Sequence, residues 1–203
     1  MPDGPPGAGG RGVAMAGRPV RADPLSVGAI VAVALRLAAR DGLEAVRMRD
    51  VAAELDVAAG ALYWHVSSQR ALQVAVVEAV LGAVPSPSEL RGTPRERITR
   101  HIRLLQRALV DNPGITGAVI ANAPDTPLGA KLRDGVRAAL REAGLSHPAA
   151  HRAFLALEWL WLGSRTGTGP HAYDQETFDA ALTALLDGIL GTAPGAPDEG
   201  AYR

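Results

Sequence analysis

The stretch that decides the fold of this chain is MRDVAAELDVAAGALYWHV, residues 48–66. Apolar residues up to Leu55 fall on one helical face, a turn follows, and a second apolar run begins. This pattern predicts a helix, a tight turn and another short helix. The second helix ends in consecutive Tyr63, Trp64 and His65, and consecutive helical residues point about 100° apart. The three rings cannot all face one core, so we expect at least one of them on the surface.

Pro and Gly divide the rest of the chain into further helices, with no alternating strand pattern. Ser26 has the form of an N-cap for a first helix that stops at Asp41, and the Ser67-Ser68 pair opens a helix that continues to Pro85. Beyond a linker rich in Pro and Ser, helices are expected at about 94–111, 113–123, 127–143, 147–166 and 175–190. The sequence therefore predicts an all-α protein of about nine helices.

The composition excludes several classes of protein. The 203 residues carry 21 cationic and 21 acidic side chains, so the chain is not a globally basic coat for nucleic acid. Cysteine is absent, which excludes disulfides, Cys-ligated zinc, iron–sulfur clusters and cysteine nucleophiles. No signal peptide and no apolar run of membrane length is found. We therefore expect a cytoplasmic protein without a membrane partner.

The short helix after the turn is suited to approach a DNA duplex. Its start is lined by the small residues Ala58, Ala59, Gly60 and Ala61. A short helix with so little side-chain bulk, held by two other helices, can fit the major groove. The sequence pattern thus favours a helix-turn-helix unit.

Residues 51–66, VAAELDVAAGALYWHV, followed by QRAL at 69–72, resemble the DNA-binding domain of the TetR family of repressors. The run LYWHV at 62–66 is especially similar to the tetracycline repressor branch. The resemblance extends over residues 25–84. Beyond residue 90 only the number and lengths of the helices agree with the family's ligand-binding and dimerisation domain.

The resemblance implies an N-terminal three-helix DNA-binding domain followed by a helical ligand-binding and dimerisation domain. It implies a homodimeric transcriptional repressor whose two recognition helices enter successive major grooves of a pseudo-palindromic operator. A small-molecule inducer of unknown identity would release the DNA. With the Gly- and Pro-rich ends included, the expected organisation is a disordered arm at 1–23, a DNA-binding domain at 24–70, a ligand-binding and dimerisation domain at 71–191 and a disordered tail at 192–203.

The resemblance also implies roles for individual residues at the DNA. Arg49 matches a position that reaches a base or phosphate, and Tyr63 and His65 match positions that contact phosphates or sugars. Alternatively, Arg49 is a solvated residue paired with Asp50 or Glu54, and Tyr63 is a core ring. The full set of expected DNA-binding residues is Arg49, Ala59, Gly60, Ala61, Tyr63, Trp64, His65 and Gln69. This set has few polar base readers, and Gln69 stands where the family usually has a basic residue.

The run from Phe154 to Leu162 is apolar all round except for Glu158. A helix without a polar face is buried on both sides, here by a ligand cavity and by another subunit. Glu158 is the candidate for orienting an amine or hydroxyl of the ligand, and the alternative is an ion pair with Arg152 or Arg165. The expected ligand-binding residues are His101, Leu105, Phe154, Glu158 and Trp161. For His101, a satisfied core histidine is the alternative.

Dimerisation is expected through the last two long helices. The second of them carries an apolar stripe at spacings typical of helix packing. The expected interface residues are Leu155, Trp159, Leu162, Phe178, Leu182, Leu185 and Ile189.

Two other functions remain open for this sequence. One is an α-helical enzyme that uses Glu158 and a histidine as acid and base, although no paired catalytic motif is present. The other is a regulator with a vestigial pocket. His147 and His151 have the spacing of two metal ligands without a third, so neither a metal nor another cofactor is expected. The resemblance to the tetracycline repressor branch implies a His soon after the fourth helix that helps to hold a magnesium–drug chelate. This chain has no His after that helix until His101, which argues against tetracycline as the inducer.

Overall fold

The computed structural model describes residues 25–166 and 174–191, and every regular element in these ranges is helical. The elements are α1 (Val27–Asp41), α2 (Met48–Glu54), α3 (Ala59–Leu62), α4 (Gln69–Leu81), the 3-10 helix η1 (Pro87–Glu89), α5 (Pro94–Asp111), α6 (Thr116–Asn122), the 3-10 helix η2 (Ala123–Asp125), α7 (Pro127–Glu142), α8 (His147–Thr166) and α9 (Gln175–Leu190). The predicted all-α class is confirmed. The expected arm at 1–23 and tail at 192–203 lie outside the described residues.

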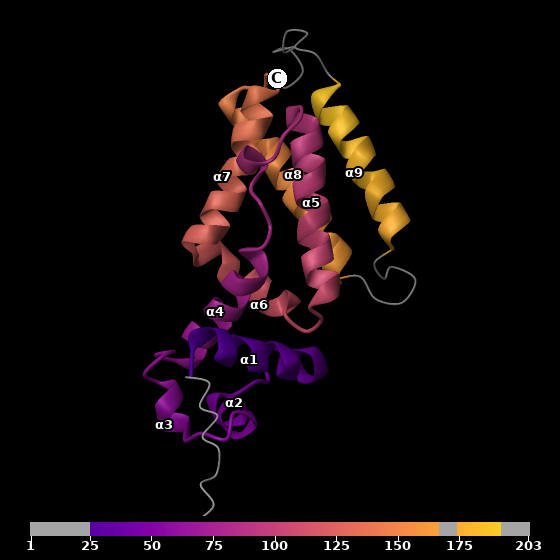
Figure 1. Cartoon of the computed structure of the whole chain (residues 1–203). Helices are drawn as coiled ribbons and strands as arrows, with labels where there is room; N and C mark the ends of the chain where they lie inside the picture. The colour runs from indigo at the N-terminus through magenta and orange to yellow at the C-terminus, as the bar shows by residue number, and fades with distance from the viewer. Residues whose placement is uncertain (1–24, 167–173, 192–203) are drawn as a thin grey trace, which may run out of the picture.

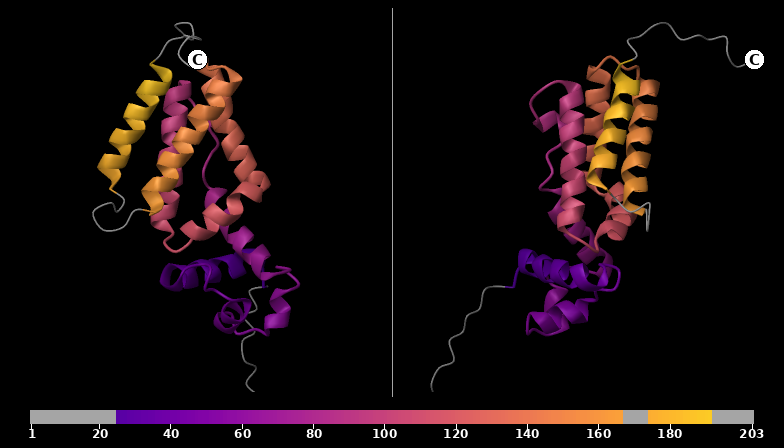
Figure 2. Two further views of the ribbon diagram at one scale, coloured as in Figure 1. Left: turned by 180° about the vertical axis from the view of Figure 1, so that it is seen from behind. Right: turned by 90° about the vertical axis from the view of Figure 1, so that its right-hand side faces the viewer.

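The helices form two packed units joined along the chain by α4 (Figure 1). Helices α1, α2 and α3 lie together at one end of the molecule, and α5, α7, α8 and α9 form a bundle at the other. Both views of Figure 2 show the long axes of the bundle helices running away from the small N-terminal unit. Helix α6 lies at the junction, where it packs against α4.

Local capping explains why several helices begin where the sequence predicts. The hydroxyl of Ser26 accepts from the N–H of Ala29 at 3.2 Å, and the hydroxyl of Ser68 accepts from the N–H of Ala71 at 3.0 Å. Asp174 caps α9 by accepting from the N–H of Thr177 at 2.8 Å. Each cap satisfies an N–H that has no partner within the helix.

Three predicted helices differ from the structure at their ends, and the first of them, α4, ends at Leu81 instead of continuing to Pro85. Helix α3 ends at Leu62, and the chain continues through a turn at 63–65 instead of helix to Val66. Helix α6 begins at Thr116 and not at 113, because Gly114 adopts a φ of 84° that interrupts the helical path. The linker at 85–94 contains the short helix η1, which packs against α7.

Two hydrophobic clusters support this arrangement. The first joins α1, α2, α3 and α4 and continues into α6, with Ile30, Leu62 and Leu72 fully enclosed. The second is the interior of the bundle, centred on Ile98, Leu140 and Leu186. None of the helices in the described ranges is long and apolar enough to cross a membrane.

Candidate DNA interface and ligand cavity

The turn between α2 and α3 is held by backbone hydrogen bonds back to α2. The N–H of Asp56 donates to the carbonyl of Ala53 at 3.2 Å, and that of Val57 donates to Ala52 at 3.0 Å. Asp56 has a φ of 54°, a left-handed conformation that Asp tolerates better than most residues. The buried side chain of Leu62 fixes α3 on the core beneath it. The predicted helix, turn and short helix are therefore present.

The surface of α3 and the following turn is open and partly aromatic. Ala58 and Gly60 are exposed, and the space beside Gly60 is empty. Trp64 has 91% of its surface exposed, and Tyr63 and His65 are also exposed. The expectation of at least one outward ring is confirmed, and the alternative that Tyr63 is a core ring is wrong. Two adjacent exposed rings beside small residues form a contact surface and not a core.

Arg49, the second residue of α2, extends into solvent. Its side chain is 84% exposed, and its Nε lies 3.5 Å from Oδ1 of Asp50. An exposed pair of this length contributes little to stability and leaves the guanidinium free to exchange partners. Without DNA, Arg49 therefore pairs with Asp50, as the alternative expected. This exposed pair does not prevent Arg49 from contacting a base or phosphate.

Gln69 differs from the expectation of a DNA contact. Its Nε2 donates to the carbonyl of Val46 at 2.6 Å, and its Oε1 accepts from the N–H of Met48 at 3.3 Å. Both ends of the amide are therefore used inside the protein. Gln69 is the first residue of α4, and its bonds fasten α4 to the residues that open α2. In the protein without DNA, Gln69 therefore acts as a structural link, and its contact with DNA stays a prediction.

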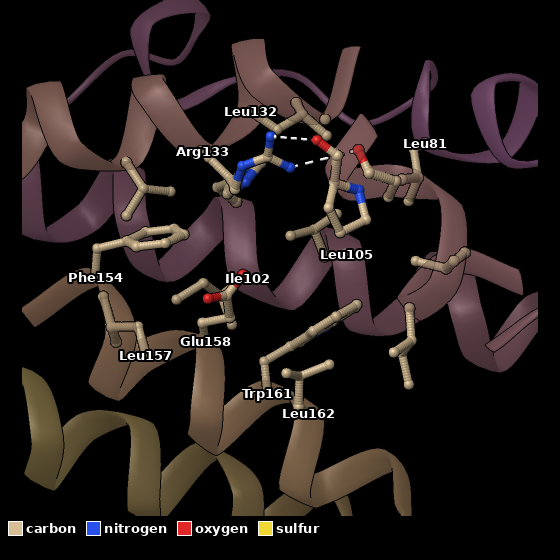
Figure 3. A pocket seen from close by; sticks show the side chains of 17 residues that line it. Leu81, Ile102, Leu105, Leu132, Arg133, Phe154, Leu157, Glu158, Trp161 and Leu162 are labelled. Atoms are coloured by element: carbon tan, nitrogen blue, oxygen red, sulfur yellow. Dashed lines mark hydrogen bonds between the residues drawn. The ribbon is translucent and has the colours of Figure 1, made fainter. Parts of the chain in front are cut away.

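A cavity of about 160 Å³ lies between α5, α6, α7 and α8, with Leu81 at the end of α4 on its wall. It is lined by all five residues expected from the sequence: His101, Leu105, Phe154, Glu158 and Trp161. Figure 3 shows Glu158 between Phe154 and Trp161 on α8, facing Ile102 and Leu105 of α5. The structure thus brings together residues from two helices about 50 positions apart in sequence.

His101 is buried and contributes to the wall as a neutral ring. Its Nδ1 lies 2.8 Å from the carbonyl oxygen of Pro85. Burial lowers the pKa of His101 because the charged imidazolium loses hydration, and the bond to Pro85 only partly opposes this effect. A carbonyl can only accept, so the hydrogen lies on Nδ1 and Nε2 keeps its lone pair.

Glu158 is half-buried, and its carboxylate has no hydrogen bond or ion pair among the residues that the structure describes. Of its two expected partners, Arg152 is exposed and the side chain of Arg165 lies outside the described side chains. A carboxylate on an apolar wall loses hydration that no neighbour replaces. This feature sets Glu158 apart from His101 and Arg133 of the same cavity, which both form hydrogen bonds within the protein.

The sequence analysis missed Arg133 of α7, which lines the cavity beside α6. Its Nη2 donates to the carbonyl of Pro124 at 2.8 Å, and its Nη1 donates to Ala123 at 3.4 Å (Figure 3). The guanidinium is thereby anchored on η2. No local signal identified it, because an Arg within a polar helix is usually a solvated residue.

Two residues expected at a dimer interface belong to the interior of the single chain. Phe178 and Leu182 are 4% and 1% exposed, because α9 packs this side against α5 and α8. Leu162 lines the cavity instead. Leu155, Leu185 and Ile189 are half-buried, and Trp159 is 68% exposed. The apolar stripe of α9 is therefore a core face, and Trp159 is the one member of the expected set that is largely on the surface.

The remaining candidate sites also find ordinary structural explanations. Arg97, Arg103 and Arg107 of α5 form ion pairs with acidic side chains, and their own side chains are 12%, 49% and 80% exposed. His147 and His151 are exposed, and no group of three potential metal ligands occurs among the described residues.

The DNA-facing unit and the whole fold both have relatives. Residues 30–76 match the family of bacterial regulatory proteins called the tetR family. An HTH-type transcriptional regulator of Saccharopolyspora erythraea is 31% identical over 135 residues, which are 66% of this chain and 57% of that protein. The chain therefore spans less than two thirds of that relative's length.

Two further relatives cover more of the chain. An HTH-type transcriptional repressor of Mycobacterium tuberculosis is 27% identical over 84% of this chain and 73% of its own length. The crystal structure of BioQ with its double-stranded DNA operator is 26% identical, with a TM-score of 0.66 over 83% of this chain and 99% of that one. The helix-turn-helix geometry and these matches agree that residues 30–76 form a DNA-binding domain of the tetR family of bacterial regulatory proteins.

Proposed function

We propose that this chain is a homodimeric transcriptional repressor that a small molecule releases from a pseudo-palindromic operator. One observation carries the proposal: the DNA-facing helices and the cavity lie at the two ends of α4. Gln69 at its first residue is bonded to the segment that opens α2, and Leu81 at its last residue lines the cavity. The 13 residues of α4 span about 20 Å at 1.5 Å per residue.

Helix α6 supplies a second connection between the cavity and the DNA-facing unit. The N–H of Leu43, just after α1, donates to the carbonyl of Gly114 at 2.8 Å. A Cβ at Gly117 would collide with the carboxylate of Glu44. Further along the same helix, Val119 lines the cavity. A ligand that displaces α6 would therefore press on the end of α1, which is packed against α2.

These connections explain release as a difference in affinity. A ligand shifts a protein toward the conformation that it binds better, and by no more than that difference. If the liganded dimer holds its two α3 helices at a spacing that does not suit successive major grooves, ligand and operator weaken each other's binding equally. The cavity favours this function over that of a regulator acting without ligand.

Dimerisation through α8 and α9 is supported by the exposed indole of Trp159. Covering this large exposed ring with a second subunit removes apolar surface from water, which is favourable. Operator binding is supported by the outward set of Arg49, Tyr63 and Trp64. Repression is the activity that the name of the M. tuberculosis relative states for that protein.

DNA binding is tested by selecting duplexes from a random library with the full chain and measuring their affinity by fluorescence anisotropy. We expect enrichment of an inverted repeat bound by a dimer. Arg49→Ala should weaken binding, whereas Arg141→Ala, at an exposed position of α7 in the distant bundle, should not. Selection of sequences without two-fold symmetry would contradict the proposal.

Ligand response is tested by screening compounds for an increase in the melting temperature of the DNA-free protein. A compound that binds the folded state stabilises it by RT ln(1 + [L]/Kd). Each stabilising compound should lower operator affinity. Stabilising compounds that leave operator affinity unchanged would contradict the proposed release mechanism.

A further inference from the structure

The size and walls of the cavity suit a compact ring system. Its volume is about 160 Å³, close to the roughly 150 Å³ of an engineered apolar cavity that binds benzene. The walls are aliphatic and aromatic, with Ile102 and Leu105 on one side and Phe154 and Trp161 on another (Figure 3). One or two fused rings would fill this space and replace its lost dispersion contacts.

Two polar side chains of the cavity, Glu158 and His101, offer hydrogen-bond acceptors to a ligand. The Glu158 carboxylate has no partner among the described residues, and an ionised carboxylate only accepts. His101 donates its Nδ1 hydrogen to Pro85, which leaves the Nε2 lone pair as its second polar function. A ligand that satisfies these groups must therefore supply donors.

Arg133 is the charged donor of the cavity wall, and two of its five N–H groups are used by the protein. Arg133 donates to the carbonyls of Pro124 and Ala123, which hold its charged head against η2. The Nε1 atom of Trp161 has no acceptor, but the protein encloses it so fully that a molecule in the cavity does not reach it. An anionic ligand would have only the remaining N–H groups of Arg133, which is held against η2, and it would meet the charge of Glu158.

We infer that the cavity binds a compact aromatic amine, with the rings against Phe154 and Trp161 and the ammonium group paired with the Glu158 carboxylate. His101 Nε2 is available for a second donor on the ligand. The ammonium ion supplies both the charge and the hydrogens that this carboxylate lacks, and charge-assisted hydrogen bonds are stronger than neutral ones. The inference deepens the proposed function and rests on it for its biological use.

The test uses three probes with the same naphthalene ring and different polar groups. They are 1-naphthylmethylamine, which is protonated at neutral pH, the neutral 1-naphthylmethanol and the anionic 1-naphthoate. Binding to the purified full chain is measured by isothermal titration calorimetry. The amine should bind about tenfold more tightly than the alcohol, as expected for a charge-assisted bond, and naphthoate should bind most weakly.

Glu158→Gln keeps the shape of the side chain and removes its charge. In this variant the amine should bind no more tightly than the alcohol, while the affinity for the alcohol stays within about twofold of the wild-type value. Glu176→Gln, at an exposed carboxylate of α9 that does not line the cavity, is the matched control and should behave as wild type. The ranking of the three probes on wild-type protein is informative even if a variant folds poorly.

Three results would overturn the inference. If naphthoate binds as tightly as the amine, the polar anchor is Arg133. If the amine still binds more tightly than the alcohol in Glu158→Gln, the ammonium group lies elsewhere. If none of the three probes binds, this ligand class is excluded. The proposed function fails separately: it fails if the amine binds through Glu158 without changing operator affinity. It survives if another compound releases the operator while all three probes fail.

Discussion

Gln69→Ala should loosen the DNA-facing unit without removing a DNA contact. The substitution deletes the hydrogen bonds to Val46 and Met48, of 2.6 and 3.3 Å, and leaves a carbonyl beside a buried residue without its partner. At about 0.5 to 1.5 kcal/mol for each bond, the free energy of unfolding should fall by about 1 to 3 kcal/mol. For a chain of this size, each 1 kcal/mol lowers the melting temperature by roughly 2 to 4 °C.

Operator affinity should fall as well, because the start of α2 and hence Arg49 are no longer fixed relative to α4. The dependence of affinity on salt should stay the same, since the slope counts phosphate contacts and Gln69 makes none in this account. Gln73→Ala is the matched control: Gln73 lies one turn later on α4, half-buried and without such bonds among the described residues.

Thermal melts and anisotropy titrations at several salt concentrations measure both effects. Equal melting temperatures for Gln69→Ala and the Gln73→Ala control would refute the structural role of Gln69. It would also be refuted if Gln69→Lys bound the operator more tightly than wild type with a steeper salt dependence, as a phosphate contact requires.

Three further predictions follow from exposure, charge and burial. Arg49→Ala should weaken operator binding by about 1 to 3 kcal/mol if the guanidinium of Arg49 reads a base. If anisotropy gives Arg49→Ala the same operator affinity as the Arg141→Ala control, Arg49 does not read a base. Trp159→Asp should convert the dimer to monomer in sedimentation at micromolar concentration, because it places a charge on the largest exposed apolar side chain of α8; an unchanged dimer would move the interface elsewhere. The lowered pKa of His101 means that the unfolded chain takes up a proton that the folded chain resists. Stability should therefore be fully present above the ordinary pKa of histidine and fall as the pH drops below it, and melts of His101→Asn should show a weaker loss on acidification.

Helix limits show how far local sequence determines this fold. The starts of α1, α4 and α9 are set by Ser26, Ser68 and Asp174, whose side chains bond to an N–H three residues later. Because such a cap joins residues only three positions apart, it can be predicted from a short segment of the sequence. The exceptions are α3 and α6, whose ends depend on a turn after Leu62 and on the positive φ of Gly114.

The candidate sites were predictable to different degrees for the same reason. An outward ring at 63–65 was predicted because three consecutive helical side chains cannot share one face. The rings are exposed, but they lie in the turn after α3 and not in the helix. The role of Gln69 did not, because its partners lie 21 and 23 residues earlier. Arg133 was missed because the carbonyls that anchor it belong to another element.

The sequence by itself determined the all-α class, most helix limits, the helix-turn-helix unit and the apolar character of α8 and α9. These features depend on capping, on helical period and on residue type, which act over a few neighbouring residues. Only the tertiary structure decided what covers each apolar face: Phe178 and Leu182 are buried in the core of their own chain, and Leu162 faces the cavity. Periodicity shows that a face must be covered, but the hydrophobic effect is non-directional and does not specify by what.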